Sequence, residues 1–260
     1  MLTTSTTLAR VGLDAIALKP TECDVSAAAS MPIETVAIDY EGREHFPDPD
    51  VLADLADETD VRLTTPVRAD GFDPLGDASL LADLPESIGR VLVAGHPAYL
   101  SEEERARAVA PRLGDALADD PDAWVGTESV ERVAMATGAT QYDLLSRSTP
   151  RELRALRAAG FAGEIAVYAP TVLTDDEDAV LDAVGAYVAR RRPVAAVLPD
   201  GAPTDSSATG RARDVLLEAA REYAVVGTED ELRAQTDALH EAGATTIVGY
   251  PARGIESLRS

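Results

Sequence analysis

The carboxy-terminal stretch from residue 223 to residue 251 constrains the fold most, because strand and helix signals alternate within it without overlap. A short apolar run opens the stretch, and Thr228 and Glu231 then have the spacing of a reciprocal capping box. Gly243 supplies the left-handed residue that commonly ends a helix. The β-branched run Thr245–Val248 completes the stretch and is typical of a buried strand. This stretch is therefore interpreted as one strand–helix–strand unit.

The same alternation recurs upstream, where short apolar runs are separated by helical patterns and turn residues. The expected strands are Val11–Leu18, Ile33–Asp39, Val61–Pro66, Arg90–Gly95, Ala123–Gly126, Tyr142–Leu145, Glu164–Ala169, Pro193–Leu198, Tyr223–Val226 and Thr245–Val248. Ser/Thr-x-x-Glu capping boxes begin at Ser101, Thr149, Thr174 and Thr228. A chain that alternates strand and helix in this way is expected to form a mainly parallel sheet.

Eight such units of about 30 residues fit a closed (β/α)8 barrel of the TIM type, which is commonly built from about 250 residues. We therefore expect residues 1–260 to form a single α/β barrel domain. An open dinucleotide-binding sheet would need a glycine-rich turn after its first strand, and the segment 19–21, Lys-Pro-Thr, has no glycine. Nine or ten apolar runs compete for eight places, so either Val194–Leu198 or Tyr223–Val226 must lie outside the barrel.

Charge is the most unusual property of the composition. The chain has 46 acidic and 23 basic residues and a net charge of -23, and Lys19 is its single lysine. A dispersed acidic surface keeps a protein solvated in concentrated salt, which screens self-repulsion. We therefore expect a salt-adapted, halophilic setting. The sequence shows no Lys/Arg stripe of the kind that phosphate backbones require, so no nucleic-acid partner is expected.

The location of the protein is also an expectation from the sequence. A single cysteine, Cys23, excludes an intramolecular disulfide and a thiolate cluster. The first ten residues lack the apolar core of a signal peptide, and no window approaches the roughly 18 apolar residues of a membrane span. These features indicate a cytoplasmic protein without a membrane partner that acts on a small molecule, and a homodimer remains open.

Five segments resemble the luciferase-like monooxygenase superfamily. They are Pro121–Gly160, Glu164–Leu173, Ala224–Val248 and, more loosely, Leu52–Val67 with Gly89–Gly95. This resemblance implies an (α/β)8 barrel that binds FMN or a deazaflavin at its carboxyl-terminal mouth, and an oxidoreductase activity. The chain departs from the family in its short length, in the absence of a long insertion in its front half, and in Gly126-Thr127 where members often have Gly-Gly.

In a barrel, functional residues lie where strands end at the carboxyl-terminal face. This rule selects three candidate catalytic residues: Lys19, Asp39 and His96. Lys19 would serve as a phosphate-binding charge or a Schiff-base amine. His96 and Asp39 would serve as proton donors or acceptors, with Glu41 beside Asp39. Each also has a plain structural interpretation, as a surface charge or a turn residue.

Candidate cofactor-binding residues follow from the same rule. They are Thr64, Gly126, Thr127, Ser129, Arg147, Ser148 and Tyr168. Backbone N–H groups at the helix starts after Gly126 and Arg147 favour an anion, and the arginine adds a charge that matches phosphate. No ligand spacing joins His45, His240 and the carboxylates, so no metal site is expected.

Three functions remain open from the sequence. The first is a flavin- or deazaflavin-dependent oxidoreductase, as the resemblance implies. The second is a catalytically degenerate barrel that acts as a binding or regulatory protein. The third is a lyase or aldolase that uses Lys19 as its nucleophile.

Overall fold

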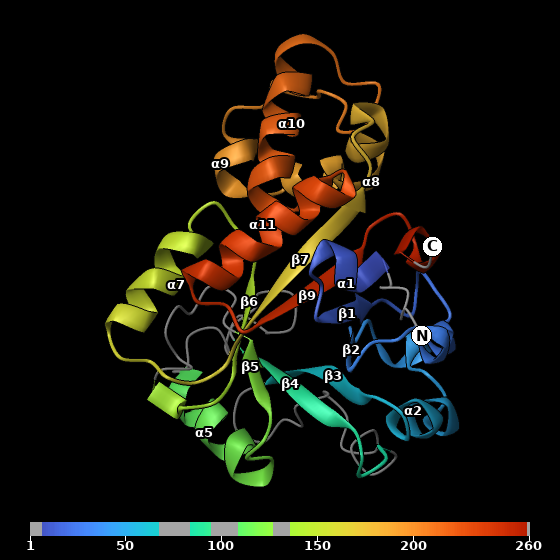
Figure 1. Ribbon diagram of the computed structural model, residues 1–260, viewed down its shortest axis with the longest axis vertical. Helices are drawn as coiled ribbons and strands as arrows, with labels where there is room; N and C mark the ends of the chain where they lie inside the picture. Colours follow the sequence, from blue (N-terminus) through green and yellow to red (C-terminus); the bar gives the residue numbers. More distant parts are fainter. Residues whose placement is uncertain (1–6, 68–83, 95–108, 127–135, 259–260) are drawn as a thin grey trace, which may run out of the picture.

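The computed structural model describes residues 7–67, 84–94, 109–126 and 136–258. Within these parts, eight parallel strands close into a barrel with helices around it (Figure 1). The barrel strands are β1 (Ala15–Leu18), β2 (Thr35–Ile38), β3 (Asp60–Val67), β4 (Gly89–Ala94), β5 (Trp124–Gly126), β6 (Gln141–Leu144), β7 (Ile165–Leu173) and β9 (Thr246–Pro251). Pairing of β9 with both β7 and β1 completes the ring. The predicted TIM-like barrel is thus confirmed.

The barrel excludes both of the apolar runs that were considered for its eighth strand, Val194–Leu198 and Tyr223–Val226. Strand β8 (Val225–Gly227) pairs with the far end of β7, at residues 171–173. The predicted strand Pro193–Leu198 is wrong, because its beginning forms the short helix α9 (Arg192–Ala195). Pro193 lies in the first turn of α9. Backbone N–H groups in the first turn have no acceptor within the helix, so a proline, which lacks this group, loses no hydrogen bond there. A short alanine-rich apolar run is ambiguous between strand and helix, and here the proline decides for the helix.

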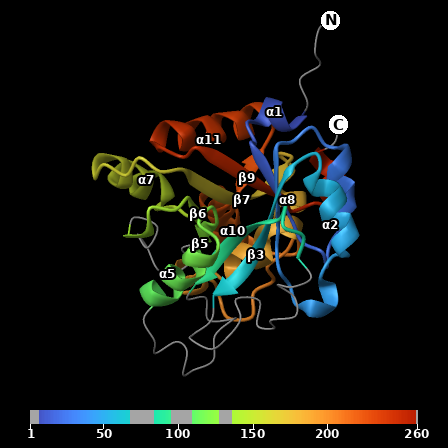
Figure 2. The same ribbon diagram turned by 90° about the horizontal axis from the view of Figure 1, so that it is seen from below.

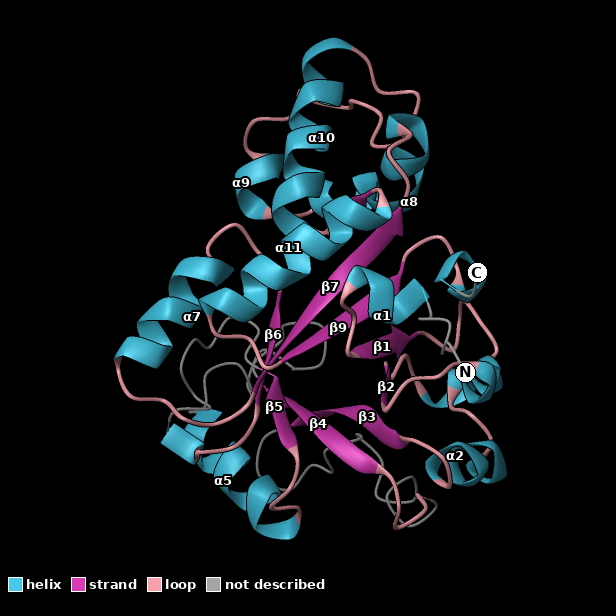
Figure 3. Cartoon of the chain, viewed as in Figure 1, coloured by secondary structure: helices cyan, strands magenta, loops and turns pink. Residues whose placement is uncertain are grey.

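The helices surround the barrel on its outside, as Figures 2 and 3 show. They are α1 (Thr7–Val11), α2 (Pro49–Ala56), α5 (Val109–Asp119), α7 (Thr149–Ala158), α8 (Glu177–Ala189), α10 (Gly210–Tyr223) and α11 (Glu229–Ala242), with 3₁₀ turns η1 (Val25–Ser30), η2 (Arg43–His45) and η3 (Ile255–Leu258). Helix α11 packs between α1 and α7, and α8 packs on α10. Among the described residues, no helix combines the length and the apolar character that crossing a bilayer would require.

One predicted capping box is confirmed. Thr228 Oγ1 accepts a hydrogen bond from the Glu231 backbone N–H, while the Glu231 carboxylate accepts one from the Thr228 backbone N–H at 2.8 Å. Helix α11 also ends as predicted at Gly243, whose φ of 123° lies in the left-handed region. The box predicted at Ser101 begins outside the described residues.

Two predicted boxes are wrong. The cap of α8 is Asp176 rather than Thr174, because the Asp176 carboxylate accepts from the N–H groups of residues 178 and 179. Thr149 is already the first residue of α7, and its buried hydroxyl is used in the preceding turn. There it accepts from the Ser146 N–H and donates to the Leu144 carbonyl oxygen.

The barrel interior is filled by small side chains on one side and by rings on the other. Its buried members are Ala15, Ala17, Ala37, Val91, Trp124, Tyr142, Ala166, Tyr168 and Val248. Alanines on β1, β2 and β7 leave the space that the rings from β5, β6 and β7 fill, so the close packing of a protein interior is reached with few aromatic residues. Two larger aliphatic clusters lie outside this one, and one of them holds α8, α9 and α10 together beside β8.

Candidate functional site

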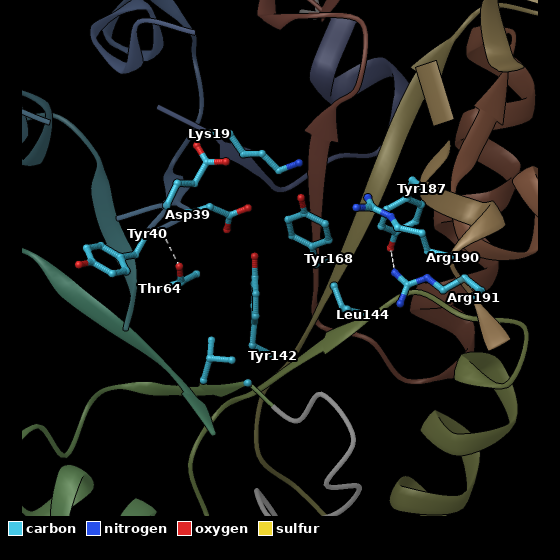
Figure 4. Close-up of a pocket in the computed structure, with 13 residues that line it drawn as sticks. Lys19, Asp39, Tyr40, Thr64, Tyr142, Leu144, Tyr168, Tyr187, Arg190 and Arg191 are labelled. Carbon is cyan, nitrogen blue, oxygen red and sulfur yellow. Dashed lines mark hydrogen bonds between the residues drawn. The ribbon is translucent and has the colours of Figure 1, made fainter. Parts of the chain in front are cut away.

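A cavity of about 560 Å³ opens at the carboxyl-terminal end of the barrel strands. We call it the mouth cavity. It is lined by Lys19, Asp39, Tyr40, Glu41, Thr64, Val93, Gly126, Tyr142, Leu144, Tyr168, Tyr187, Arg190 and Arg191 (Figure 4). Its size falls within the roughly 300–1,000 Å³ of small-molecule sites, and it lies where active sites of such barrels are built.

Five of the residues selected from the sequence meet in the mouth cavity. Lys19 follows β1 directly and Asp39 follows β2 directly, while Thr64, Gly126 and Tyr168 belong to β3, β5 and β7. Parallel strands that end at one level place these side chains around a common opening, which is why a rule based on strand ends could find them.

The other selected residues are placed elsewhere or lie outside the described residues. Arg147 is exposed, and neither it nor Ser148 lines the mouth cavity. The Ser148 hydroxyl lies 3.0 Å from the Ser146 hydroxyl, within the turn that precedes α7. His96, Thr127 and Ser129 fall outside the described residues. The roles given to all of these residues remain predictions.

The ammonium of Lys19 is held at one side of the opening by two contacts. Its Nζ lies 3.4 Å from Glu22 Oε1 and 4.0 Å from the centre of the Tyr250 ring. The Tyr250 hydroxyl donates a hydrogen bond to the other oxygen of Glu22. A ring face and a carboxylate both attract an ammonium group, so these contacts position the Lys19 side chain.

Rings from four strands form a continuous row through the barrel. Trp124 and Tyr142 have ring centres 5.8 Å apart, Tyr142 and Tyr168 6.0 Å, and Tyr168 and Tyr250 6.1 Å. The last pair is stacked with an interplanar angle of 10°. Separations of this size are favourable for aromatic pairs. The row gives the mouth cavity a rigid wall.

The phenol of Tyr168 is kept protonated by its surroundings. Burial raises the pKa of Tyr168 well above the ordinary value of 10.0, and the negative charge of Asp39 raises it further. Burial likewise raises the pKa of Tyr250, with a contribution from the hydrogen bond to Glu22. Both phenols therefore stay protonated over the physiological pH range; the Tyr250 proton is used in the hydrogen bond to Glu22, and Tyr168 lines the mouth cavity.

Local hydrogen bonds fix the end of β2 at the opening. The Tyr40 backbone N–H donates to Thr64 Oγ1 at 2.8 Å, which ties β2 to β3. The Glu41 carboxylate accepts from both the N–H and the hydroxyl of Thr21, at 2.9 and 2.6 Å. Asp39 therefore sits on a segment whose backbone is held from both sides.

The sequence analysis missed the residues that complete the opposite end of the mouth cavity. These are Tyr142, Leu144, Tyr187, Arg190 and Arg191. Tyr187 comes from α8, and the two arginines follow directly after it. A signal was present in the sequence, because residues 190–192 are three consecutive arginines in a chain with twice as many acidic as basic residues.

No metal site is formed by the described residues, among which no group of three His, Cys, Asp or Glu side chains converges. His240 is instead part of the packing of α11. Its Nε2 lies 3.2 Å from Asp14 Oδ2, and its Nδ1 lies 3.2 Å from the Ala244 carbonyl oxygen. His45 lies beside Glu44 on the η2 turn.

Comparison with solved structures supports the fold. An F420-dependent secondary alcohol dehydrogenase in complex with an F420-acetone adduct is similar at 13% identity and a TM-score of 0.51, covering 95% of this chain and 100% of that chain. The oxygenating constituent of 3,6-diketocamphane monooxygenase from the CAM plasmid of Pseudomonas putida, a type II Baeyer–Villiger monooxygenase in complex with FMN, is similar at 15% identity and a TM-score of 0.49, covering 92% and 91%. The α/β barrel predicted from the sequence is confirmed as the fold, and the dehydrogenase shares it.

Comparison by sequence gives the family of the chain. No curated protein matches it. A family model described as "Family of unknown function (DUF7388)" matches residues 8–258, nearly the whole chain. The chain therefore belongs to this family of unknown function, DUF7388, and is built on a barrel of eight parallel strands.

Proposed function

We propose that the protein is an oxidoreductase that binds a flavin or deazaflavin ring in the mouth cavity. The observation that carries this proposal is the wall formed by Tyr142 and Tyr168 beside Asp39, at the end of the barrel where such folds place their chemistry. The similar barrel of the F420-dependent alcohol dehydrogenase is consistent with this proposal.

The residues of the mouth cavity fit a planar heteroaromatic ring. Tyr142 and Tyr168 supply aromatic surface, and Leu144 supplies apolar surface. Gly126 contributes wall without a side chain, and a Cβ added there would meet Val93 Cγ2 at 3.2 Å. A ring of this kind, when bound, supplies the hydride chemistry, and the protein supplies the surface that orients it.

The polar residues then have separate tasks. The Tyr168 hydroxyl, kept protonated by burial, donates a hydrogen bond toward the bound ring or substrate. Asp39 accepts a proton from the reacting group or returns one to it, which is the task of a general acid–base residue. The Lys19 side chain is positioned by Glu22 and Tyr250, and it orients polar groups at this end.

The contacts of Lys19 also bear on the lyase hypothesis. A Schiff-base lysine reacts through its neutral amine, which a desolvated or cationic environment favours. The Lys19 Nζ is instead engaged by the Glu22 carboxylate at 3.4 Å and by the Tyr250 ring at 4.0 Å. We therefore do not propose a lysine-dependent lyase, and the degenerate binding barrel remains as the outcome that the following test distinguishes.

The test is a titration of the protein with FMN and with a deazaflavin in molar potassium chloride, followed by ring fluorescence. We expect at least one ring to bind, and Tyr168→Ala to weaken it roughly tenfold or more, which corresponds to about 1.4 kcal/mol. Tyr168→Phe retains the ring face and should bind within about threefold of the unmodified protein, a difference of less than 1 kcal/mol. If neither ring binds the unmodified, folded protein, the oxidoreductase is excluded and the binding barrel becomes the better account.

Catalysis is tested separately from binding. With a bound ring and a hydride donor or acceptor that reacts with it, Asp39→Asn should slow turnover by roughly 10²–10⁴-fold, the contribution typical of general acid–base catalysis. Asp54→Asn is the matched control, because Asp54 is exposed on α2, outside the mouth cavity. Equal rates for the two variants would contradict the role of Asp39.

A further inference from the structure

We infer that Arg190 and Arg191 form an anion-binding site at one end of the mouth cavity, which takes the phosphate or carboxylate group of the ligand bound there. This inference deepens the proposed function, on which its description of the ligand ring rests. The anion site itself does not depend on a flavin, because it follows from the charge and geometry of Arg190 and Arg191.

The charged groups of the mouth cavity are divided between its two ends. Lys19, Asp39 and Glu41 come from the segments that follow β1 and β2, and at this end two carboxylates face one ammonium. Arg190 and Arg191 come from the end of α8, and no acidic side chain from that segment lines the cavity among the described residues. Figure 4 shows the tyrosines of the barrel between the two groups. An oxyanion is repelled at the first end and attracted at the second.

Arg191 is oriented by aromatic neighbours. Its guanidinium lies over the Tyr187 ring at 4.3 Å and near the Tyr223 ring at 5.8 Å, and Nη2 donates a hydrogen bond to the Tyr187 hydroxyl. Its Nε is buried and has no acceptor among the described residues. A buried donor without an acceptor is unfavourable, so a small rotation that turns this edge of the guanidinium toward an oxyanion is favoured.

Arg190 is the more accessible of the two. Its side chain is exposed and lines the mouth cavity, and it makes no ion pair or hydrogen bond with any other described residue. It can therefore be directed toward a ligand without breaking an existing contact. Two adjacent guanidinium groups offer the planar forks that bind phosphate and carboxylate oxygens in pairs.

The helix offers an alternative reason for arginines at this position. Cations are favoured at helix carboxyl ends by the helix dipole, and Arg190 is the residue at which α8 ends. Arg192 belongs to the same run but is exposed and does not line the mouth cavity. It is thus a matched control, because its replacement removes an equal charge from the same run.

The first experiment uses inorganic phosphate and needs no flavin. Thermal midpoints are measured at constant molar potassium chloride with increasing millimolar phosphate, for the unmodified protein and for variants. Phosphate should raise the midpoint of the unmodified protein and of Arg192→Met. The rise should be absent in Arg190→Met/Arg191→Met and reduced in Arg190→Met. The Arg190 side chain makes no ion pair or hydrogen bond with another described residue, so the single variant tests the site even if the double variant folds poorly.

The second experiment identifies the source of the anionic group by comparing FMN with riboflavin, which has the same ring without phosphate. If the group belongs to the cofactor, FMN binds the unmodified protein at least tenfold more tightly, and the difference disappears in the double variant. If the anionic group belongs to a second ligand, FMN and riboflavin bind equally tightly. The rise of the thermal midpoint with inorganic phosphate then still requires Arg190 and Arg191. Both results support the anion site.

Two outcomes would overturn the inference. One is a phosphate effect and an FMN preference that are unchanged in Arg190→Met/Arg191→Met. The other is a loss of both in Arg147→Met, which would place the anion at the helix start predicted from the sequence. If phosphate binds through Arg190 and Arg191 while no flavin or deazaflavin binds, the proposed oxidoreductase fails and the anion site stands.

Discussion

The guanidinium of Arg157 donates two hydrogen bonds to the carbonyl oxygen of Gly243, from Nε at 3.0 Å and from Nη2 at 2.7 Å. Its Nη1 donates to the carbonyl oxygens of Phe161 and Gly163 at 2.9 and 2.7 Å. One side chain thus joins the ends of α7 and α11. Gly243 permits this approach, because a Cβ there would lie 2.7 Å from Arg157 Cγ.

Replacing Arg157 should therefore destabilise the barrel through the ends of two helices. Arg157→Met retains the length of the side chain but removes four charge-assisted hydrogen bonds, and we expect a loss of roughly 2–4 kcal/mol in the free energy of unfolding. Urea denaturation measures this loss. Arg154→Met, on the exposed face of the same helix, is the control and should change stability by less than about 0.5 kcal/mol. Equal effects of the two substitutions would show that the Arg157 contacts contribute nothing specific.

Tyr168 should make the protein less stable at alkaline pH. Its pKa in the folded protein lies well above the ordinary 10.0, so the unfolded chain loses the phenol proton first as the pH rises. The stabilisation is fully present below pH 10 and is lost as the pH rises above it. Tyr168→Phe removes this titration, so its urea midpoint should fall less between pH 9 and 11 than that of the unmodified protein, about one pH unit to either side of the ordinary value. Parallel curves would contradict the burial of the phenol.

Much of the barrel was predictable because its signals are local. Alternating apolar runs predicted the eight strands that form the ring, and Thr228 with Glu231 predicted the start of α11. The sequence signal failed where two local interpretations competed. An aspartate two residues further along displaced the cap predicted at Thr174, and Pro193 began a helix where a strand was expected.

The side of the mouth cavity built from strand ends was largely predictable, although Tyr142 and Leu144 of β6 were missed, and the side built from α8 was not predictable. Lys19 and Asp39 follow barrel strands directly, so the fold alone places them at the opening. Arg190 and Arg191 come from the end of a helix, and their position depends on the extension of β7 and the packing of α8 on α10. Such long-range packing leaves no periodic pattern in the sequence.

The packing of α8 depends on a close approach at Gly185. A Cβ at this position would lie 2.0 Å from the Thr204 carbonyl oxygen, which belongs to the backbone and has little freedom to move. Gly185→Ala should therefore destabilise the protein by roughly 1–3 kcal/mol, the range of an overpacked site. It should also weaken phosphate binding, because it displaces the helix that carries Arg190.

Gly114→Ala in α5 should change the stability of the protein in the opposite direction from Gly185→Ala. A Cβ at Gly114 would meet no atom of the described residues within 4 Å, and alanine is the better helix former, so stability should rise by roughly 0.5–1 kcal/mol. Thermal or urea denaturation of both variants checks the pair. A stabilising effect of Gly185→Ala would contradict the close approach of α8 to residue 204.

The dependence of stability on salt follows from the net charge of -23. Self-repulsion within so acidic a chain is screened over about 10 Å at 0.1 M salt and about 3 Å at 1 M. The thermal midpoint should therefore rise steeply between about 0.1 and 2 M potassium chloride if the acidity is an adaptation to salt. A flat response would show that the repulsion is compensated within the folded protein.

The carboxyl end of α2 offers a local version of this test. Asp54, Asp57 and Glu58 are exposed there, and no basic residue lies in the last turn, although the helix dipole favours cations at this end. Replacing all three with lysine changes the net charge from -23 to -17, since each exchange adds two positive units. We expect a gain of roughly 1–2 kcal/mol at 0.1 M salt, at about 0.3–1 kcal/mol for each dipole interaction. The gain should largely disappear at 2 M potassium chloride, because screening removes the repulsion that the lysines relieve. A gain that persists undiminished in high salt would mean that helix propensity, rather than charge, causes the change.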